Sequence, residues 1–288
     1  MIPAQFDYLT PQTLDEAVAL LAQHQDEAKI LAGGHSLIPA MKLRLATPQI
    51  LIDIGRIKDL SYISEEGDEV RIGAMTTHYQ IESSDRLREI CPLLSECAAA
   101  IGDVQVRNKG TIGGSLAHAD PAADWPAAIL ALDAQIVTAS AKGERVIKAE
   151  DFFVDFFATA LDAGEILREI RINAPQGRFG HAYVKVPQPA SGFAVVGVAV
   201  ALALDQSGAC QSASIGITGI ASKAYRATSV EQALAGTALD DEAIAKAAGS
   251  AADGVVINGD LYASESYRAH LAVVHTRRAI KAAASKAK

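Results

Sequence analysis

The chain has 288 residues, of which 50% are hydrophobic and 21% are charged, and its formal net charge is −8. This length predicts two domains with a large apolar core, and the acidic balance argues against a nucleic-acid partner, because phosphate neutralisation needs clustered Lys and Arg. Three cysteines without a CxxC pair argue against zinc and iron–sulfur sites, and we expect a cytoplasmic protein with no membrane span.

The first predicted elements form a small unit of strand, glycine turn, helix and strand. Thr13 and Glu16 match a capping box, so a helix is expected to begin there. Residues 29–32 have the pattern of a short buried strand, Ser36 is placed to cap a short helix, and residues 50–54 form the next strand. This order puts a Gly-Gly pair at the carboxyl end of a strand, where ligands of open α/β sheets tend to bind.

The middle of the chain contains further predicted strands and helices. Strands are expected at residues 70–74, 135–139 and 166–172, and helices after Thr76 or Thr77, at residues 92–101 and from Asp124 to about residue 132. Residues 110–124, GTIGGSLAHADPAAD, are expected to form an open loop. Residues 173–177 give the strongest turn signal in the chain and are the predicted domain boundary.

Three β-rich runs follow this boundary, at residues 182–186, 193–204 and 210–220. Helices are predicted after them, one capped near Ser229 and a long one over residues 264–286. Strands followed by helices indicate an antiparallel sheet with helices on one face, so the second domain is predicted to be α+β.

Two short stretches, AGGHS at residues 32–36 and TIGGS at residues 111–115, each hold a Gly-Gly pair beside small polar side chains. Without a Cβ, such a pair lets successive N–H groups point into one concavity, and a neighbouring hydroxyl adds another donor. Two cradles of this kind are suited to both phosphates of a dinucleotide. A Gly-Gly pair is also an ordinary turn signal, and neither stretch is a Rossmann or P-loop motif, so the residues alone leave both alternatives open.

Asp120 and Asp124 follow the second Gly-Gly pair and have two explanations. Either one can cap the next helix, or Asp124 accepts hydrogen bonds from the hydroxyl groups of a ligand beside the cradle while Asp120 is structural. His35 and His118 lie close by, but two histidines are too few for a metal centre, so no metal site is predicted. The sequence has no hydrolase or metalloprotease motif, so no catalytic side chain is predicted.

At these stretches the sequence resembles the FAD-binding medium subunits of the molybdenum hydroxylases, and among them the carbon monoxide dehydrogenase medium-chain group. The same module is the central domain of xanthine dehydrogenase. The resemblance covers essentially the whole chain and is carried by KILAGGHSLIPAMKLRLATPQILIDI (29–54), IGAMTTH (72–78), QVRNKGTIGGSLAHADPAADWPA (105–127) and GEILREIRI (164–172).

The resemblance implies an α+β fold. A PCMH-type FAD-binding domain would occupy residues 1–176, in two α/β subdomains of about 1–57 and 58–176. A C-terminal domain of the carbon monoxide dehydrogenase flavoprotein type, an antiparallel sheet with helices, would occupy residues 177–288.

The resemblance also implies non-covalent FAD with its pyrophosphate on the two glycine stretches. In the family, an Asp at the position of Asp124 binds the ligand, apolar residues at Ile101 and Leu167 pack on it, and a lysine at Lys185 lies near the flavin. The residues expected at the cofactor are Lys29, Ile30, Leu31, Ala32, Gly33, Gly34, His35, Ser36, Leu37, Ile101, Thr111, Ile112, Gly113, Gly114, Ser115, Asp124, Leu167, Lys185 and Phe193.

Two departures from the family pattern bear on the substrate. Ser115 stands where relatives often carry Asn or Asp, although its hydroxyl can still donate. Residues 184–197, VKVPQPASGFAVVG, replace a basic stretch, and Phe193 takes the place of a Tyr or Trp that lies over the flavin. The phenyl ring can still stack but has no polar tip, and the lost positive charges argue against carbon monoxide as the substrate.

The function implied by the resemblance is electron transfer within a heteromeric hydroxylase, expected as a dimer of heterotrimers. Molybdenum–molybdopterin would be on a large subunit and [2Fe–2S] clusters on a small subunit, with NAD, oxygen or quinone as the external acceptor. One rival is a self-contained PCMH-type flavin oxidase or reductase, in some of which a histidine placed like His35 is bonded covalently to FAD. A nucleotide-sensing protein without redox activity is a third alternative.

Overall fold

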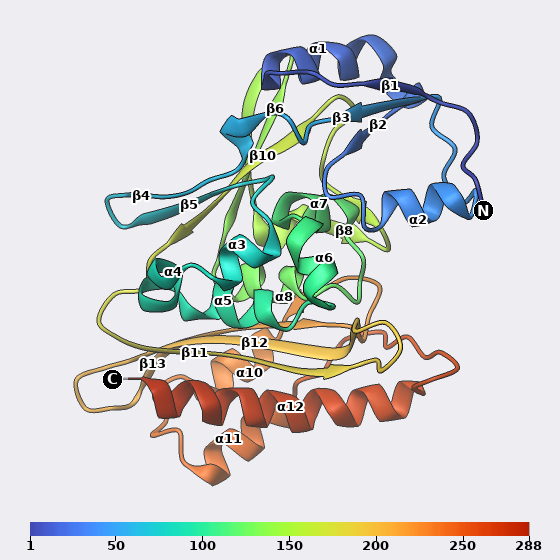
Figure 1. Cartoon of the computed structure of the whole chain (residues 1–288). Coiled ribbons are helices and arrows are strands. Elements are labelled where there is room, and N and C mark those ends of the chain that lie inside the picture. The colour runs from blue at the N-terminus through green and yellow to red at the C-terminus, as the bar shows by residue number, and fades with distance from the viewer. Residues whose placement is uncertain (288) are drawn as a thin grey trace.

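The computed structural model describes residues 1–287; Lys288, the last residue of the predicted C-terminal domain, lies outside the described residues. Figure 1 shows an N-terminal unit at one end, a C-terminal sheet with its long last helix at the other, and a layer of short helices between them. No helix in residues 1–287 combines the length and apolar character that crossing a bilayer requires.

The N-terminal unit is a parallel sheet in the order β1-β3-β2 with two helices. Its elements are β1 (Asp7–Leu9), α1 (Leu14–His24), β2 (Ala28–Leu31), α2 (Leu37–Lys42) and β3 (Ile50–Asp53). The hydroxyl of Thr13 accepts the N–H of Glu16, which confirms the predicted start of α1. Ser36 occupies the N-cap position of α2, but its side chain makes no capping hydrogen bond.

The middle unit is an antiparallel sheet in the order β4-β5-β10-β6-β7. Its strands are β4 (Ile63–Glu66), β5 (Glu69–Gly73), β6 (Gln135–Ser140), β7 (Gly143–Lys148) and β10 (Ile166–Asn173). Its other elements are α3 (His78–Glu82), α4 (Asp85–Ile90), α5 (Pro92–Ala99), α6 (Val104–Lys109), α7 (Ile112–His118), α8 (Trp125–Ala131), α9 (Ala149–Phe152), β8 (Phe153–Asp155) and β9 (Ala158–Thr159). Apolar side chains from its strands and helices share one core.

The stretch expected to be an open loop is partly helical. α7 begins directly after Thr111, whose hydroxyl accepts the N–H of Gly114 at 3.1 Å. The glycines have a low helix propensity, but the Thr111 cap and the burial of Ile112 and Leu116 outweigh it. The expectation of a loop across residues 110–124 was therefore wrong.

The C-terminal unit is an antiparallel sheet in the order β11-β12-β13-β14. Its elements are β11 (Arg178–Pro187), β12 (Ala194–Leu204), β13 (Cys210–Thr218), β14 (Tyr225–Arg226), α10 (Thr228–Leu234), α11 (Asp241–Ala248) and α12 (Glu265–Lys286). Ser264 caps α12 as predicted, whereas Ser229 lies inside α10 and does not cap it.

Helices cover both faces of the C-terminal sheet. α12 packs on β11 and β12 from one side, while α5 and α8 of the middle unit pack from the other (Figure 1). A Cβ on Gly216 would lie 2.1 Å from the carbonyl oxygen of Ala127, so glycine is required where β13 meets α8. This double coverage explains the nearly continuous burial of β12, and it fixes the middle unit against the C-terminal sheet.

Candidate cofactor site

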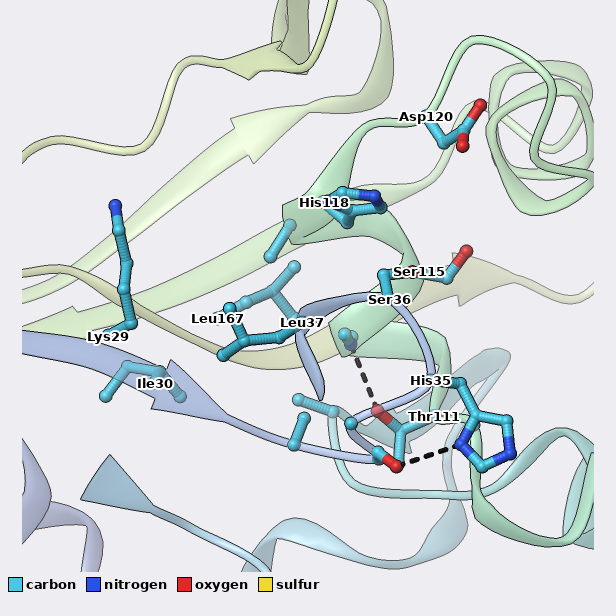
Figure 2. Close-up of a pocket in the computed structure, with 18 of the residues that line it drawn as sticks. Lys29, Ile30, His35, Ser36, Leu37, Thr111, Ser115, His118, Asp120 and Leu167 are labelled. Carbon is cyan, nitrogen blue, oxygen red and sulfur yellow. Dashed lines mark hydrogen bonds between the residues drawn. The ribbon is translucent and has the colours of Figure 1, made fainter. Parts of the chain in front are cut away.

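A cavity of about 790 Å³ runs between the three units. Both glycine stretches line it, together with the start of β10 and a turn ahead of β12. Figure 2 shows Lys29 and Ile30 at one end of the view and the labelled side chains of both glycine stretches around the same space. Its size lies within the range typical of small-molecule and cofactor sites.

The first glycine stretch presents unpaired backbone donors. Within residues 1–287, the N–H groups of Gly33, Gly34, His35 and Ser36 have no hydrogen-bond acceptor. Gly34 has a φ of 76°, a left-handed conformation that glycine adopts without the steric penalty of a Cβ. Consecutive free N–H groups at a turn are an anion-binding arrangement, so this stretch fits a phosphate group.

The second glycine stretch has used the backbone donors of residues 112–115, whereas the Thr111 N–H has no hydrogen-bond acceptor within residues 1–287. Ile112 N donates to Thr76 O at 3.1 Å, and Gly113 N donates to Ala74 O at 2.9 Å. Gly114 N and Ser115 N both donate to Thr111, the first to its hydroxyl and the second to its carbonyl. The expectation that both stretches offer a cradle of successive N–H groups was therefore wrong for the second stretch, which has the Thr111 N–H and the Ser115 hydroxyl left to offer.

The two stretches lie in direct contact with each other. A Cβ on Gly33 would lie 2.2 Å from the carbonyl oxygen of Lys109 and 2.8 Å from Cα of Gly110. A Cβ on Gly114 would lie 3.2 Å from Cβ of Ala32. Gly33 is thus required because the two backbones touch, and this contact joins the stretches into one wall of the cavity.

Most of the residues predicted at the cofactor line this cavity, and three do not. The side chain of Leu31 is buried with Met41 and Leu51 in a small core of the N-terminal unit. Ile112 is fully buried in the core of the middle unit. Lys185, the third, is held by an ion pair behind the cavity wall.

Asp124 and Lys185 form a buried ion pair between the middle and C-terminal units. Lys185 Nζ lies 2.8 Å from both carboxylate oxygens of Asp124 and donates to the carbonyl oxygen of Ala100 at 2.8 Å. The Tyr183 hydroxyl also donates to Asp124. Burial raises the pKa of Asp124, while the Lys185 charge and the two hydrogen bonds act in the opposite direction. The proposed helix cap is absent, because Asp124 makes no side-chain capping bond to α8.

A second carboxylate, that of Asp120, lines the cavity next to His118 and Phe157. Asp120 Oδ1 accepts the N–H of Ala122 at 2.8 Å, and its other oxygen has no partner within residues 1–287. The rings of His118 and Phe157 lie 4.9 Å apart. No group of three potential metal ligands occurs among the described residues.

The cavity lining also includes the apolar residues Ile101, Leu167 and Phe193. Phe193 is 42% exposed. It ends a turn of the C-terminal unit in which a Cβ on Gly192 would lie 3.3 Å from Cα of Gly102, so this turn reaches the middle unit beside Ile101. The apolar surface that results suits a flat aromatic ring system.

Sequence reasoning missed one polar pair at the cavity. Trp125 Nε1 donates to His78 Nδ1 at 3.0 Å, and His78 lines the cavity while remaining only 4% exposed. The two residues are 47 positions apart in the chain, and no local pattern connects them.

The Thr111 cap leads to a stability prediction. Thr111→Val removes the hydroxyl that accepts the N–H of Gly114, so we expect the free energy of unfolding to fall by about 1 kcal/mol. Urea denaturation followed by the fluorescence of the single tryptophan measures this change. Thr111→Ser retains the hydroxyl and should stay close to the parent chain; a loss equal to that of Thr111→Val would contradict the capping role.

Family models and known proteins match the chain over almost its whole length. The family model for the FAD binding domain in molybdopterin dehydrogenase matches residues 4–175, and that for the CO dehydrogenase flavoprotein C-terminal domain matches residues 181–283. The carbon monoxide dehydrogenase medium chain of Afipia carboxidovorans is 41% identical over 100% of both chains. The 6-hydroxypseudooxynicotine dehydrogenase complex subunit alpha of Paenarthrobacter nicotinovorans is 38% identical over 94% of this chain and 92% of that one. A structure of carbon monoxide dehydrogenase from Hydrogenophaga pseudoflava covers 100% of both chains with a TM-score of 0.97 and 41% identity. The chain therefore belongs to the FAD-binding medium-subunit family of the molybdenum hydroxylases.

Proposed function

We propose that this chain is the FAD-binding electron-transfer subunit of a heteromeric molybdenum hydroxylase. It would stand between [2Fe–2S] clusters of a small subunit and an external acceptor, with molybdopterin on a large subunit. The observation that carries the proposal is the run of free N–H groups at residues 33–36 in the wall of a cavity that apolar residues also line.

The cavity-lining residues fit the two parts of FAD. The free N–H groups and the Ser115 hydroxyl are donors for the pyrophosphate, and Ile101, Leu167 and Phe193 would contact the ring system. Bound FAD would supply the redox chemistry, and the chain's own residues would position it and exclude water. Leu31, Ile112 and Lys185 would support the cavity wall from behind rather than touch the cofactor.

The finer features of the assembly belong to the same proposal. We propose a dimer of heterotrimers that passes electrons to NAD, oxygen or quinone in the cytoplasm, where three buried free thiols would remain reduced. We also propose a domain boundary at residues 176–177, in the segment between β10 and β11. The relatives' names specify carbon monoxide and 6-hydroxypseudooxynicotine, so medium chains of similar sequence serve enzymes with different substrates.

Copurification tests the proposal. Expression together with a molybdopterin subunit and a cysteine-rich small subunit from neighbouring reading frames should give a yellow complex containing all three chains. Its flavin absorbance should bleach when the substrate of the large subunit is added under anaerobic conditions. A chain that never carries FAD and never associates with such subunits would refute the proposed function.

The attachment of FAD separates the proposal from its covalent rival. His35 is exposed, and its Nδ1 lies 3.2 Å from the carbonyl oxygen of Gly33. We expect acid precipitation to release all the flavin into the supernatant, and His35→Ala to keep the flavin content of the parent chain to within a few-fold. Flavin that remains in the protein pellet of the parent chain and is released in His35→Ala would support the rival oxidase.

A further inference from the structure

His78 has the geometry of a neutral hydrogen-bond donor at the place where the two glycine stretches meet. The indole N–H of Trp125 can only donate, so His78 Nδ1 must accept and the ring proton resides on Nε2. Nε2 has no hydrogen-bond partner within residues 1–287, and it is not among the atoms sealed from solvent. Burial lowers the pKa of His78 to about 4, and the charges of His35 and Arg107 act in the same direction.

Gly110 brings the second stretch alongside this imidazole. The backbone N–H of His78 donates to the carbonyl oxygen of Gly110 at 3.0 Å. A Cβ on Gly110 would lie 2.6 Å from His78 Nε2, so a side chain there would cover the free N–H. Gly33 in turn lies against Gly110, so Gly110 is a neighbour of both the imidazole and the first stretch.

The cavity wall has few free hydrogen-bond donors near the second stretch, so the Nε2–H of His78 could serve as one of them. The N–H groups of residues 112–115 are all engaged inside the protein, so among the described residues the Thr111 N–H is the one backbone donor that the second stretch leaves free for a phosphate. Both His78 and Ser115 line the same cavity and have side-chain donors free of protein partners. Because His78 Nε2 is not sealed from solvent, a water molecule or a ligand in the cavity can accept its proton.

We propose that His78 is an FAD-binding residue whose Nε2–H donates to a pyrophosphate oxygen, and that Trp125 is the positioning residue that fixes its tautomer. This assignment rests on the proposed function, because it assumes that FAD occupies the cavity. The contact adds a side-chain donor beside a stretch in which, among the described residues, the Thr111 N–H is the one free backbone donor.

Two variants of the full chain test the assignment. His78→Phe keeps a ring but has neither the acceptor nor the donor, and we expect the FAD dissociation constant to rise about 10- to 100-fold, as for a hydrogen bond to a charged group. His78→Gln retains an oxygen that can accept from Trp125 and an amide N–H that can donate, so it should recover most of this loss. Flavin fluorescence titration of apo-protein with FAD measures both.

A spectroscopic readout needs no variant. In the parent chain labelled with ¹⁵N-histidine, the His78 nitrogens should show the Nε2–H tautomer in apo-protein, and the Nε2 resonance should shift when FAD is added. A ³¹P resonance of bound FAD should differ between the parent chain and His78→Phe. If His78→Phe fails to fold, the ¹⁵N shift of the parent chain decides.

The outcomes separate this assignment from the proposed function. If the parent chain binds FAD but the His78 resonances do not move, or folded His78→Phe binds FAD as tightly as the parent chain, the assignment is overturned and the proposed function stands. If the chain binds no FAD either alone or together with the molybdopterin and iron–sulfur subunits, the proposed function itself fails.

Discussion

Gly33→Ala should weaken FAD binding by roughly 10- to 100-fold. The added Cβ would lie 2.2 Å from the carbonyl oxygen of Lys109, and because both partners are backbone, neither can rotate away. The two stretches must separate, which moves the free N–H groups of the first stretch away from the phosphate. Overpacking of this kind typically costs about 1–3 kcal/mol, and each 1.4 kcal/mol taken from the binding energy is about tenfold in affinity.

Fluorescence titration of the apo-protein with FAD measures this effect, with Gly254→Ala as the matched control. A Cβ on Gly254 meets nothing within 4 Å, although its φ of 73° makes the substitution strained. Gly254→Ala should therefore reduce stability slightly and leave the FAD dissociation constant unchanged. Equal FAD affinity in Gly33→Ala and Gly254→Ala would show that contact between the stretches does not organise the site.

The sequence predicts the N-terminal unit well because local signals agree there. The Thr13 cap, the apolar run that becomes β2, and the Gly-Gly pair after it all favour one arrangement, and the structure has it. The three long strands of the C-terminal sheet are also predicted, because β12 is a nearly uninterrupted apolar run and the β-rich runs of β11 and β13 are bounded by turns.

The second glycine stretch shows where such reasoning fails. Glycine composition predicts an open loop, but a helix forms because the apolar side chains of Ile112 and Leu116 are buried by distant parts of the chain. Whether the N–H groups there are free depends on Ala74 and Thr76, which belong to a different segment. Local sequence does not contain that information.

The side chains that pair with Asp124 also could not be predicted from the local sequence. The resemblance placed both Asp124 and Lys185 close to the cofactor, but single-residue correspondence does not reveal that the two side chains neutralise each other. Pairing at a separation of 61 residues appears once β11 packs on the middle unit. Asp124, which was expected at the ligand, therefore also helps to hold the C-terminal sheet against the middle unit.

Lys185→Met should lower the free energy of unfolding by about 3–5 kcal/mol at pH 7. The substitution retains much of the side-chain volume but leaves the Asp124 carboxylate buried, with the Tyr183 hydroxyl as its remaining side-chain donor. Urea denaturation followed by Trp125 fluorescence is a suitable measurement, because Trp125 is next to Asp124 and fully buried. Lys286→Met is the control; its exposed pair with Glu96 should contribute at most about 1 kcal/mol.

The pH dependence of the same variant has a definite sign. Without Lys185, the folded-state pKa of Asp124 rises further above its ordinary value, because burial already raises it and the main opposing charge is gone. Between the unfolded and folded pKa values the folded state then holds a proton that the unfolded state has released, so stability falls as pH rises. The deficit of Lys185→Met relative to the parent chain should be smallest near about pH 4 and grow toward pH 7.

Adding Asp124→Asn to Lys185→Met removes the uncompensated charge and distinguishes an ion pair from simple packing. We expect the double variant to be more stable at pH 7 than Lys185→Met alone, and its stability difference from the parent chain to depend less on pH. FAD titration of the same proteins shows whether Lys185 contacts the cofactor or only stabilises the protein behind the cavity wall. Because Lys185 lies behind the cavity wall and its partner Asp124 lines the cavity, folded Lys185→Met should bind FAD within a few-fold of the parent chain, whereas a hundredfold loss in this single variant would place Lys185 at the cofactor.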